Sequence, residues 1–524
     1  MSETKFLYGA AVQGIQSFIF QTNKLREIVG ASELVEEICT TKFESLFQQI
    51  GVNYDMDNCI LHAAGNIKYI FDDKSDCEKI VREFPKAIFE FAPGITVSQA
   101  VVKFNGDDFK TAVNELEKRL RTQRNKPMRS ATLGLMGIER SRQTGLPVVG
   151  ERKVKGKWLP VDAGTQAKLD MFKHADEPDF ELTKSLCNTA FGKEKLFSRQ
   201  IAYDIEKMTE KNDWIAIIHA DGNGLGQIVQ AVGTDKDKFK SFSENLDKAT
   251  KIAAVKAYND VKNLFNEDKF IPIRPIVLGG DDFTTICRAD IALDYVTAFI
   301  DNFEKETSFI KDFNSDKLKF NNLTACAGIA YIKSSFPFYY GYELAEALCT
   351  QAKKDAKANL ADGELAKSCL MFHKVQDSFT EDWNAISKRE LTPQPNISFQ
   401  YGPYYLKAKD NRMTVENLKE YAEKLEGKEG NAVKSHLRQW MSMLHYNPGM
   451  ANQKLLRLIS MTDEPQNKKK FELHTFIDCT EKDKKKEVIT FLYNNTEDFK
   501  SPVYDILTIH TINNQMTKIK ETKP

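Results

Sequence analysis

Paired cysteines are the first thing this sequence lacks. Its nine cysteines are scattered over 524 residues without a C-x-x-C motif. This spacing argues against a zinc ribbon and against a disulfide scaffold, so we expect reduced and mostly buried thiols.

An excess of charge of one sign is also missing, because Lys plus Arg and Asp plus Glu each total 74. Net charge therefore gives no general attraction to nucleic acid or to a membrane. No stretch approaches the roughly 18 apolar residues of a membrane span, and the N-terminus leads directly into an apolar strand pattern. We expect a cytoplasmic protein that does not bind a membrane.

One local charge excess remains. Between Lys118 and Lys157 there are twelve basic residues against two acids, Glu139 and Glu151. Such a segment forms either a solvated surface or a site for a polyanion, and the pattern leaves both open.

The order of elements repeats along the chain, although the residues themselves do not. Hydrophobic periodicity predicts the order βαββαβ twice, each time with a further helix behind it. The first copy has strands at 5–12, 59–63, 67–71 and 95–104, with helices at 24–49, 76–90 and 108–123. The second has strands at 214–220, 271–278, 283–287 and 323–332, with helices at 239–264, 290–305 and 341–358.

This order is typical of an α+β fold with two ferredoxin-like units in tandem, each an antiparallel sheet covered by helices on one face. We expect four domains: a first unit at 1–124, a basic linking subdomain at 125–213, a second unit at 214–375 and an all-helical domain at 376–524. A Pro-rich loop at 391–396 lies near the last boundary. The lysine runs 468–470 and 484–486 are interpreted as solvated faces.

The tetrapeptide Gly279-Gly280-Asp281-Asp282 stands at the predicted hairpin turn of the second unit. Two glycines allow a tight turn, and two adjacent carboxylates at its tip concentrate negative charge. That charge is costly without a cation.

A third carboxylate, Asp221, ends the first strand of the same unit, which lies beside the hairpin in this fold. We predict that Asp221, Asp281 and Asp282 are the catalytic residues and hold Mg²⁺ or Mn²⁺ in a two-metal site, because open sets of oxygen ligands suit these ions. The structural alternative is that Asp221 only caps a helix and that Asp281 and Asp282 only fill a polar turn.

Glycines follow Asp221 in the sequence Gly222-Asn223-Gly224-Leu225-Gly226. They supply backbone room and N–H groups for a triphosphate ahead of a helix. Aligning Ala64-Gly65-Asn66-Ile67 with Gly279-Gly280-Asp281-Asp282 leaves the first unit without acids. This asymmetry favours one catalytic unit paired with a non-catalytic one.

Lys353 ends an apolar helical stripe and is a candidate phosphate ligand, with a surface lysine as the alternative. His219 lies inside a strand and is interpreted as a packed residue and not as a base.

Further motifs carry a resemblance to a known family. The segments Gly14-Ile15-Gln16-Ser17-Phe18-Ile19-Phe20, Leu25 to Ser32 and Thr144-Gly145-Leu146-Pro147, with the GGDD turn and Ala352-Lys353, are similar to the polymerase/cyclase large subunit of type III CRISPR effector complexes. The resemblance covers roughly residues 5–375 and implies tandem palm domains. It implies metal ligation by the three aspartates, phosphate contact by Lys353, and a nucleotide pocket on the first palm that includes Ser32, Gly65 and Asn66.

Two departures from that family are informative. Many members begin with a histidine-aspartate nuclease domain; because the first palm strand is predicted at 5–12, we expect no such domain here and no DNA cleavage by that route. Many also carry a cysteine zinc motif where this sequence has Glu139 to Gln143, so we expect no zinc. The resemblance implies other effector subunits and guide or target RNA as partners, with the basic segment as a contact surface.

The resulting hypothesis is a nucleotidyltransferase in antiviral defence that joins ATP into a cyclic oligoadenylate, releases pyrophosphate and is activated by target RNA. Adenylylation of a non-nucleotide acceptor such as S-adenosylmethionine by the same site stays open. So do a non-catalytic RNA-binding scaffold and a diguanylate-cyclase-like homodimer, although the covalent tandem of unlike units speaks against the last.

Overall fold

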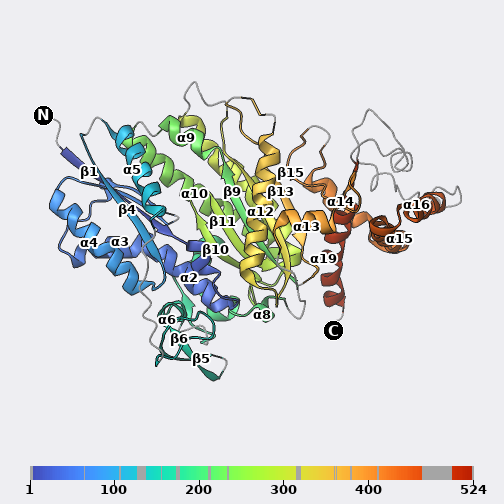
Figure 1. The fold of residues 1–524 in the computed structure, drawn as a ribbon, viewed down its shortest axis with the longest axis horizontal. Helices are drawn as coiled ribbons and strands as arrows, with labels where there is room; N and C mark the ends of the chain where they lie inside the picture. The colour runs from blue at the N-terminus through green and yellow to red at the C-terminus, as the bar shows by residue number, and fades with distance from the viewer. Residues whose placement is uncertain are drawn as a thin grey trace.

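The computed structural model describes residues 4–63, 65–105, 108–126, 137–154, 156–172, 177–209, 214–232, 235–313, 320–358, 360–361, 363–377, 381–409, 412–462 and 499–521. Figure 1 shows three blocks in chain order, with the N-terminal unit, the second unit and the C-terminal helices following one another along the long axis. None of the described helices has both the length and the apolar character needed to cross a membrane.

The first palm is a four-stranded antiparallel sheet in the order β2-β3-β1-β4. Its strands are β1 (Thr4–Gln13), β2 (Cys59–Ala63), β3 (Asn66–Phe71) and β4 (Thr96–Asn105). Its helices are α1 (Ile15–Ile19), α2 (Leu25–Glu37), α3 (Phe43–Gln49), α4 (Lys74–Phe91) and α5 (Phe109–Arg124). The predicted helix 24–49 is therefore interrupted, because a π-helical stretch, Ile38–Lys42, separates α2 from α3.

The second palm repeats this strand order as β10-β11-β9-β12 and then extends it by β13 and β15. The strands are β9 (Trp214–Asn223), β10 (Ile273–Gly279), β11 (Asp282–Arg288), β12 (Thr324–Lys333), β13 (Cys369–Lys374) and β15 (Tyr404–Tyr405). The helices are α9 (Leu225–Val232), α10 (Lys236–Val261), α11 (Ala292–Glu306) and α12 (Phe338–Lys357). Tandem palms are confirmed, and the second sheet is larger than we predicted.

Helices cover both faces of the second sheet, which corrects the expectation of one covered face. On one face Phe283 stacks on Phe299 of α11, with ring centroids 3.9 Å apart. On the other face His219 meets Tyr342 of α12, with centroids 5.6 Å apart. The reason lies in β9, whose side chains from Trp214 to Ala220 are all buried, so neither face can remain in water.

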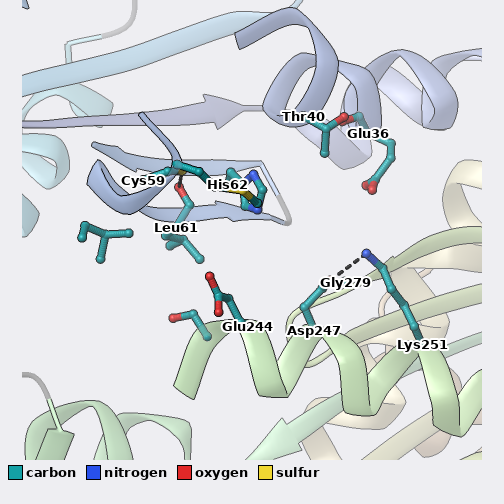
Figure 2. Close-up of a pocket in the computed structure, with 12 residues that line it drawn as sticks. Glu36, Thr40, Cys59, Leu61, His62, Glu244, Asp247, Lys251 and Gly279 are labelled. Carbon is teal, nitrogen blue, oxygen red and sulfur yellow. Dashed lines mark hydrogen bonds and ion pairs between the residues drawn. The ribbon is translucent and has the colours of Figure 1, made fainter. Parts of the chain in front are cut away.

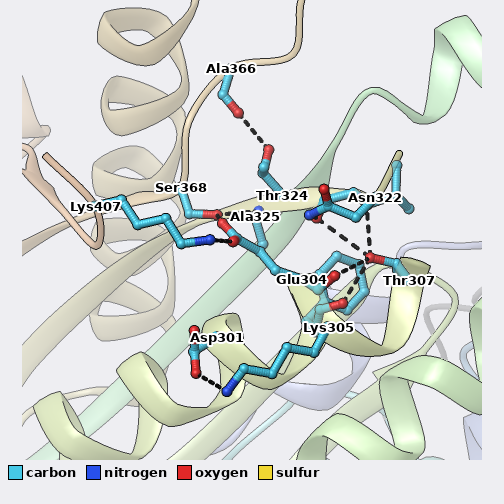
Figure 3. A network of polar contacts seen from close by, with 12 residues as sticks. Asp301, Glu304, Lys305, Thr307, Asn322, Thr324, Ala325, Ala366, Ser368 and Lys407 are labelled. Atoms are coloured by element: carbon cyan, nitrogen blue, oxygen red, sulfur yellow. Dashed lines mark hydrogen bonds and ion pairs between the residues drawn. The ribbon is translucent and has the colours of Figure 1, made fainter. Parts of the chain in front are cut away.

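A polar network fastens the end of α11 to the start of β12 (Figure 3). The buried Glu304 carboxylate accepts a hydrogen bond from Ser368 Oγ at 2.6 Å and pairs with Lys407. Thr307 accepts from the Leu323 backbone N–H at 3.0 Å. Because Thr324 then begins β12, this network holds the strand that lies next to β9.

The described residues of the linking segment form two small antiparallel strand pairs and three short α-helices. They are β5 (Val148–Val154) with β6 (Lys157–Asp162), β7 (Glu181–Leu182) with β8 (Leu196–Phe197), α6 (Ala163–Asp170), α7 (Leu186–Phe191) and α8 (Ile205–Thr209). Part of the basic segment, residues 127–136, lies outside the described residues. Use of that segment by RNA stays a prediction.

The helical character predicted for the C-terminal region is confirmed, but the region is not all-helical, because short strands also occur in it. Its helices are α13 (Trp383–Glu390), α14 (Val415–Lys424), α15 (Gly427–Tyr446), α16 (Pro448–Thr462) and α19 (Val503–Glu521). Two-residue strands, β14 (Ile397–Ser398) and β16 (Phe499–Lys500), also pair there. The lysine runs 468–470 and 484–486 lie outside the described residues, and the boundaries of the four domains stay predictions.

Candidate metal centre and adjoining cavities

Strand pairing brings the three predicted carboxylates together. Asp221 near the end of β9 lies directly opposite Asp282, the first residue of β11, and Asp281 occupies the turn beside them. A carboxylate oxygen of each lies within 4.8 Å of those of the other two. The three carboxylates therefore form one compact acidic group, and all three side chains are half-buried.

Glycines allow this compact geometry. Gly280 has a φ of 61°, in the left-handed region that the hairpin turn requires. The Gly222 N–H donates to the Asp281 carbonyl at 3.3 Å, and a Cβ on Gly222 would lie 2.9 Å from the Asp281 Cβ. Gly279 pairs with Asp282 in the ladder, and Thr250 Oγ1 donates to the Gly280 carbonyl at 2.5 Å.

Crowding of the carboxylates shifts their pKa values upward. Burial, followed by the charge of Asp221, raises the pKa of Asp282 to about 6. The pKa of Asp281 is also raised, by burial first and then by Asp282 and Asp221. Burial and mutual repulsion penalise the ionised forms, and a divalent cation would relieve both penalties. The oxygen-only donor set fits Mg²⁺ or Mn²⁺.

Lys353 reaches this group from α12. Its ammonium pairs with the Asp221 carboxylate and donates to the Gly222 carbonyl at 3.0 Å. Gly328 in β12 makes this approach possible, since a Cβ there would lie 2.0 Å from the Ala345 carbonyl oxygen of α12. Lys353 therefore lies at the carboxylate group, while its contact with a phosphate stays a prediction.

Sequence reasoning missed a fourth carboxylate, Glu346 on α12. Burial, followed by the charges of Glu343 and Asp221, raises its pKa. The charge of Glu346 also raises the pKa of Asp282. The available signal was spacing, because Glu346 precedes Lys353 by two helical turns and shares its face.

His219 is a packed residue, as interpreted from the sequence. It is 8% exposed, and its Nδ1 lies 3.1 Å from Thr284 Oγ1. Burial lowers its pKa to about 4, so the imidazole is neutral near pH 7.

The residues after Asp221 divide into different roles. The buried Asn223 donates to Thr324 Oγ1 at 3.1 Å, which ties β9 to β12. Gly224 has a φ of 89°, and a Cβ there would lie 2.4 Å from Leu365 Cδ1. A Cβ on Gly226, in α9, would meet nothing within 4 Å. The structure thus explains Asn223 and Gly224 by packing, and triphosphate contact by this loop stays a prediction.

The first palm faces the same centre. A cavity of about 70 Å³ is lined by residues of both palms, among them Ser32, Gly65, Gly279, Asp282 and Tyr342. Ser32 Oγ donates to the Ile276 carbonyl of β10. The cavity thus brings Ser32 and Gly65 beside the carboxylates, but it is too small for a nucleotide as it stands.

The hairpins align one residue away from the predicted alignment. In the first palm Asn66 pairs with both Ala63 and Ala11, just as Asp282 pairs with Gly279 and Asp221. Asn66 therefore corresponds to Asp282 and Ala11 to Asp221. The acid-free character of the first palm remains, since no aspartate or glutamate occupies these positions.

A second cavity, of about 200 Å³, adjoins the first and shares Glu36 and Gly279 with it (Figure 2). It lies between β2 and α2 of the first palm and α10 of the second. Its charged lining residues are Glu36, Glu244, Asp247 and Lys251, with a 2.6 Å ion pair between the last two. Three carboxylates and one ammonium leave this pocket acidic.

Comparisons with known proteins agree with this architecture. Residues 214–361 match the family model of the second palm domain of Cas10/Cmr2. No curated protein sequence matches the chain.

Solved structures of Csm1 share the fold. The Csm1–Csm4 cassette in complex with cA4 aligns with 98% of this chain and 70% of that chain, with a TM-score of 0.55 and 15% identity. Csm1 of T. onnurineus gives the same coverage, with a TM-score of 0.52 and 15% identity. A cassette with AMPPNP aligns with 68% of this chain and 53% of that chain, with a TM-score of 0.46 and 15% identity. This chain therefore spans about half to 70% of those Csm1 chains, and the similarity concerns the fold alone.

Proposed function

We propose that this Cas10-like chain is a metal-dependent nucleotidyltransferase that joins ATP into a cyclic oligoadenylate. The proposal starts from the match to the Cas10/Cmr2 second palm and from the Csm1-type fold. The observation that carries the proposal is the cluster of Asp221, Asp281 and Asp282 opposite the acid-free turn of the first palm. Csm1–Csm4 structures in complex with cA4 and cA3 support this product class.

The reaction joins the 3′-hydroxyl of one ATP to the α-phosphate of another, and pyrophosphate leaves. A divalent cation bound to the three aspartates would stabilise the charge of the attacking and leaving oxygens. Lys353 would exchange its pairing with Asp221 for a phosphate oxygen, and Gly222 keeps the Asp281 side chain close to Asp221. Neutral His219 supports the strand and takes no proton.

Other type III effector subunits are the proposed setting, because the related Csm1 structures hold Csm4. Guide and target RNA are proposed as the activating partner. Pyrophosphate release by the purified chain, with and without its complex and target RNA, measures how far activity depends on them.

Replacement of both turn carboxylates tests the proposal. We expect Asp281→Asn/Asp282→Asn to lose pyrophosphate release from ATP by at least about 100-fold and to weaken Mn²⁺ binding, because two oxygen ligands lose their charge. Asp268→Asn, in an exposed loop, is the control and should match the wild type. Unchanged release and unchanged Mn²⁺ binding in the double variant would sink the assignment and favour a non-catalytic scaffold.

A cationic acceptor is the second candidate function, and the acidic cavity of Figure 2 favours it. Burial raises the pKa of Glu36; the charge of Lys251 lowers it in part, and the charge of Asp247 raises it further. A sulfonium such as that of S-adenosylmethionine would offset this negative lining beside Gly279.

Product mass distinguishes the two candidates. With ATP alone the cyclic oligoadenylate hypothesis expects oligonucleotide rings, whereas the cationic acceptor hypothesis expects an AMP conjugate only when S-adenosylmethionine is added. Glu244→Gln should raise the KM for a cationic acceptor and leave ring formation from ATP unchanged, because Glu244 lines the acidic cavity and not the small cavity beside Asp282. Glu37→Gln, which does not line the cavity, is the matched control.

A further inference from the structure

A second charged site lies at the opposite end of the second palm. Trp214 begins β9 and pairs with Lys333, the last residue of β12, while Lys374 ends the neighbouring β13. Asp221 follows Trp214 by seven residue steps along β9, which is about 23 Å at the usual rise of a strand. The two ends of the sheet therefore carry separate groups.

A groove of about 670 Å³ opens at this end, between the strand ends and helices α15 and α19. We call it the basic groove and define it by Lys333, Lys374 and Arg438. Figure 1 shows β13, α15 and α19 together in the C-terminal half of the molecule. Its volume lies in the usual range of small-molecule sites.

The two lysines converge on one aromatic ring. The Lys374 ammonium lies 4.3 Å from the centroid of the Trp214 ring, and that of Lys333 lies 5.9 Å from the same centroid. Within the described part of the chain, no carboxylate lies within ion-pair distance of either ammonium. Among the described residues, these two like charges therefore have no carboxylate partner.

One acid, Glu390, also lines the groove, against the three cations Lys333, Lys374 and Arg438. Its carboxylate lies 3.0 Å from the Arg389 guanidinium, which also pairs with Asp377 and Glu381. Arg438 is fixed to the groove wall by a hydrogen bond from Nη2 to Thr511 Oγ1 at 2.9 Å. Burial, then the charges of Arg438 and Lys333, lower the pKa of Lys374, as expected for cations that lack an anion.

The groove also offers neutral groups for hydrogen bonds. The hydroxyl groups of Ser442 and Thr508 line it, and His445 lies beside them. Three cations with neighbouring hydroxyls are suited to the several oxygens of a phosphate ester, whereas one carboxylate would leave much of the positive charge unopposed.

We propose that the basic groove binds the phosphate groups of a nucleotide, either free or within an RNA strand. Lys333 and Lys374 meet the phosphate charge with their ammonium groups beside the Trp214 ring, and Arg438 closes the other wall. This site is independent of the carboxylate centre and of the reaction proposed for it.

Binding to the full chain in EDTA tests the proposal, because chelation removes the metal-dependent site from the measurement. Two probes are used. Calorimetry measures the binding of ATP, and fluorescence anisotropy measures the binding of a fluorescein-labelled single-stranded oligouridylate. We expect Lys333→Gln/Lys374→Gln to weaken binding of one probe by about tenfold or more. If the probe is RNA, the slope of log K against log salt should also fall by about 0.7 for each lost contact.

Two further variants keep the result interpretable. Lys86→Gln/Lys110→Gln makes the same charge change on α4 and α5 of the first palm and should match the wild type. Arg438→Gln, on an exposed helix face, gives a second reading if the lysine variant folds poorly.

Each outcome decides the proposal. Loss of ATP binding alone identifies a free nucleotide as the ligand, and loss of oligouridylate binding alone identifies RNA. Equal binding by the groove and control variants, or no saturable binding of either probe by the wild type, overturns it.

Discussion

At the scale of residues, the candidate site places negative charges where they oppose one another. Asp282 is buried beside Asp221 and Asp281, and its pKa rises from 3.8 to about 6. A carboxyl with a raised pKa binds more protons in the folded than in the unfolded protein between those two values. The free energy of unfolding therefore falls as pH rises through that interval.

We predict that Asp282→Asn stabilises the metal-free protein. In EDTA at about pH 7 its Tm should exceed that of the wild type by about 2–4 °C, because the repelling charge is gone. The difference should narrow as pH is lowered toward about 4.5, where the wild-type carboxyl is protonated.

Added Mn²⁺ should reverse the order, since the wild type keeps the full ligand set. Asp268→Asn serves as control and should follow the wild type in both conditions. A wild type that is the more stable protein in EDTA at neutral pH would contradict this account of the site.

At the scale of elements, the approach of α12 to the sheet decides where Lys353 lies. Gly328 has no room for a side chain, because a Cβ would also lie 2.6 Å from the Cys349 backbone nitrogen. Glu346 and Lys353 share the face of α12 that this close contact brings to the carboxylates. Helix docking thus positions two charged groups at once.

Gly328→Ala should therefore damage both stability and activity. We expect a loss of about 1–3 kcal/mol in the free energy of unfolding from overpacking. Pyrophosphate release should fall further than stability, as Lys353 moves away from Asp221. Urea unfolding and a pyrophosphate assay measure the two effects.

Gly226→Ala is the matched glycine control for stability, because its Cβ would enter open space in α9. It should change the free energy of unfolding by less than about 1 kcal/mol. An equal loss in both variants would show that close packing at Gly328 is not the cause.

At the scale of the whole molecule, the two palms are joined beside the site. Phe20 of the first palm stacks on Tyr342 of α12, with ring centroids 4.5 Å apart. The Phe338 backbone N–H donates to Asn23 Oδ1 at 3.0 Å. Tyr342 also lines the small cavity with Asp282, so contact between the palms supports one wall of the site.

We predict that Phe20→Ala loosens this contact. Truncation of a fully buried phenylalanine costs about 3–5 kcal/mol, and the freed Tyr342 should raise the KM for ATP. The midpoint of the first urea transition and steady-state kinetics measure the two effects.

Phe89, which is 61% exposed, supplies the control variant Phe89→Ala. It should stay within about 0.5 kcal/mol of the wild type. A Phe20→Ala protein with an unchanged KM would show that contact between the palms does not shape the nucleotide site.

Local pattern predicted most elements and the three aspartates. The strands around Asp221 and the GGDD turn are specified by residues close together in the chain. Hydrophobic periodicity and turn-forming residues were therefore sufficient to predict them. The strand β13 was missed, although the apolar run Cys369 to Phe372 is typical of a strand buried on both faces.

The sequence by itself determined the repeat, the identity of the clustered carboxylates and the acid-free character of the first palm, because these are properties of residues in order. Only the tertiary structure decided the strand register that matches Asn66 with Asp282, the close docking of α12 at Gly328, and the meeting of Lys333 and Lys374 with Arg438 in the basic groove. Each of these joins residues far apart in the chain through pairing and packing, which no local pattern specifies.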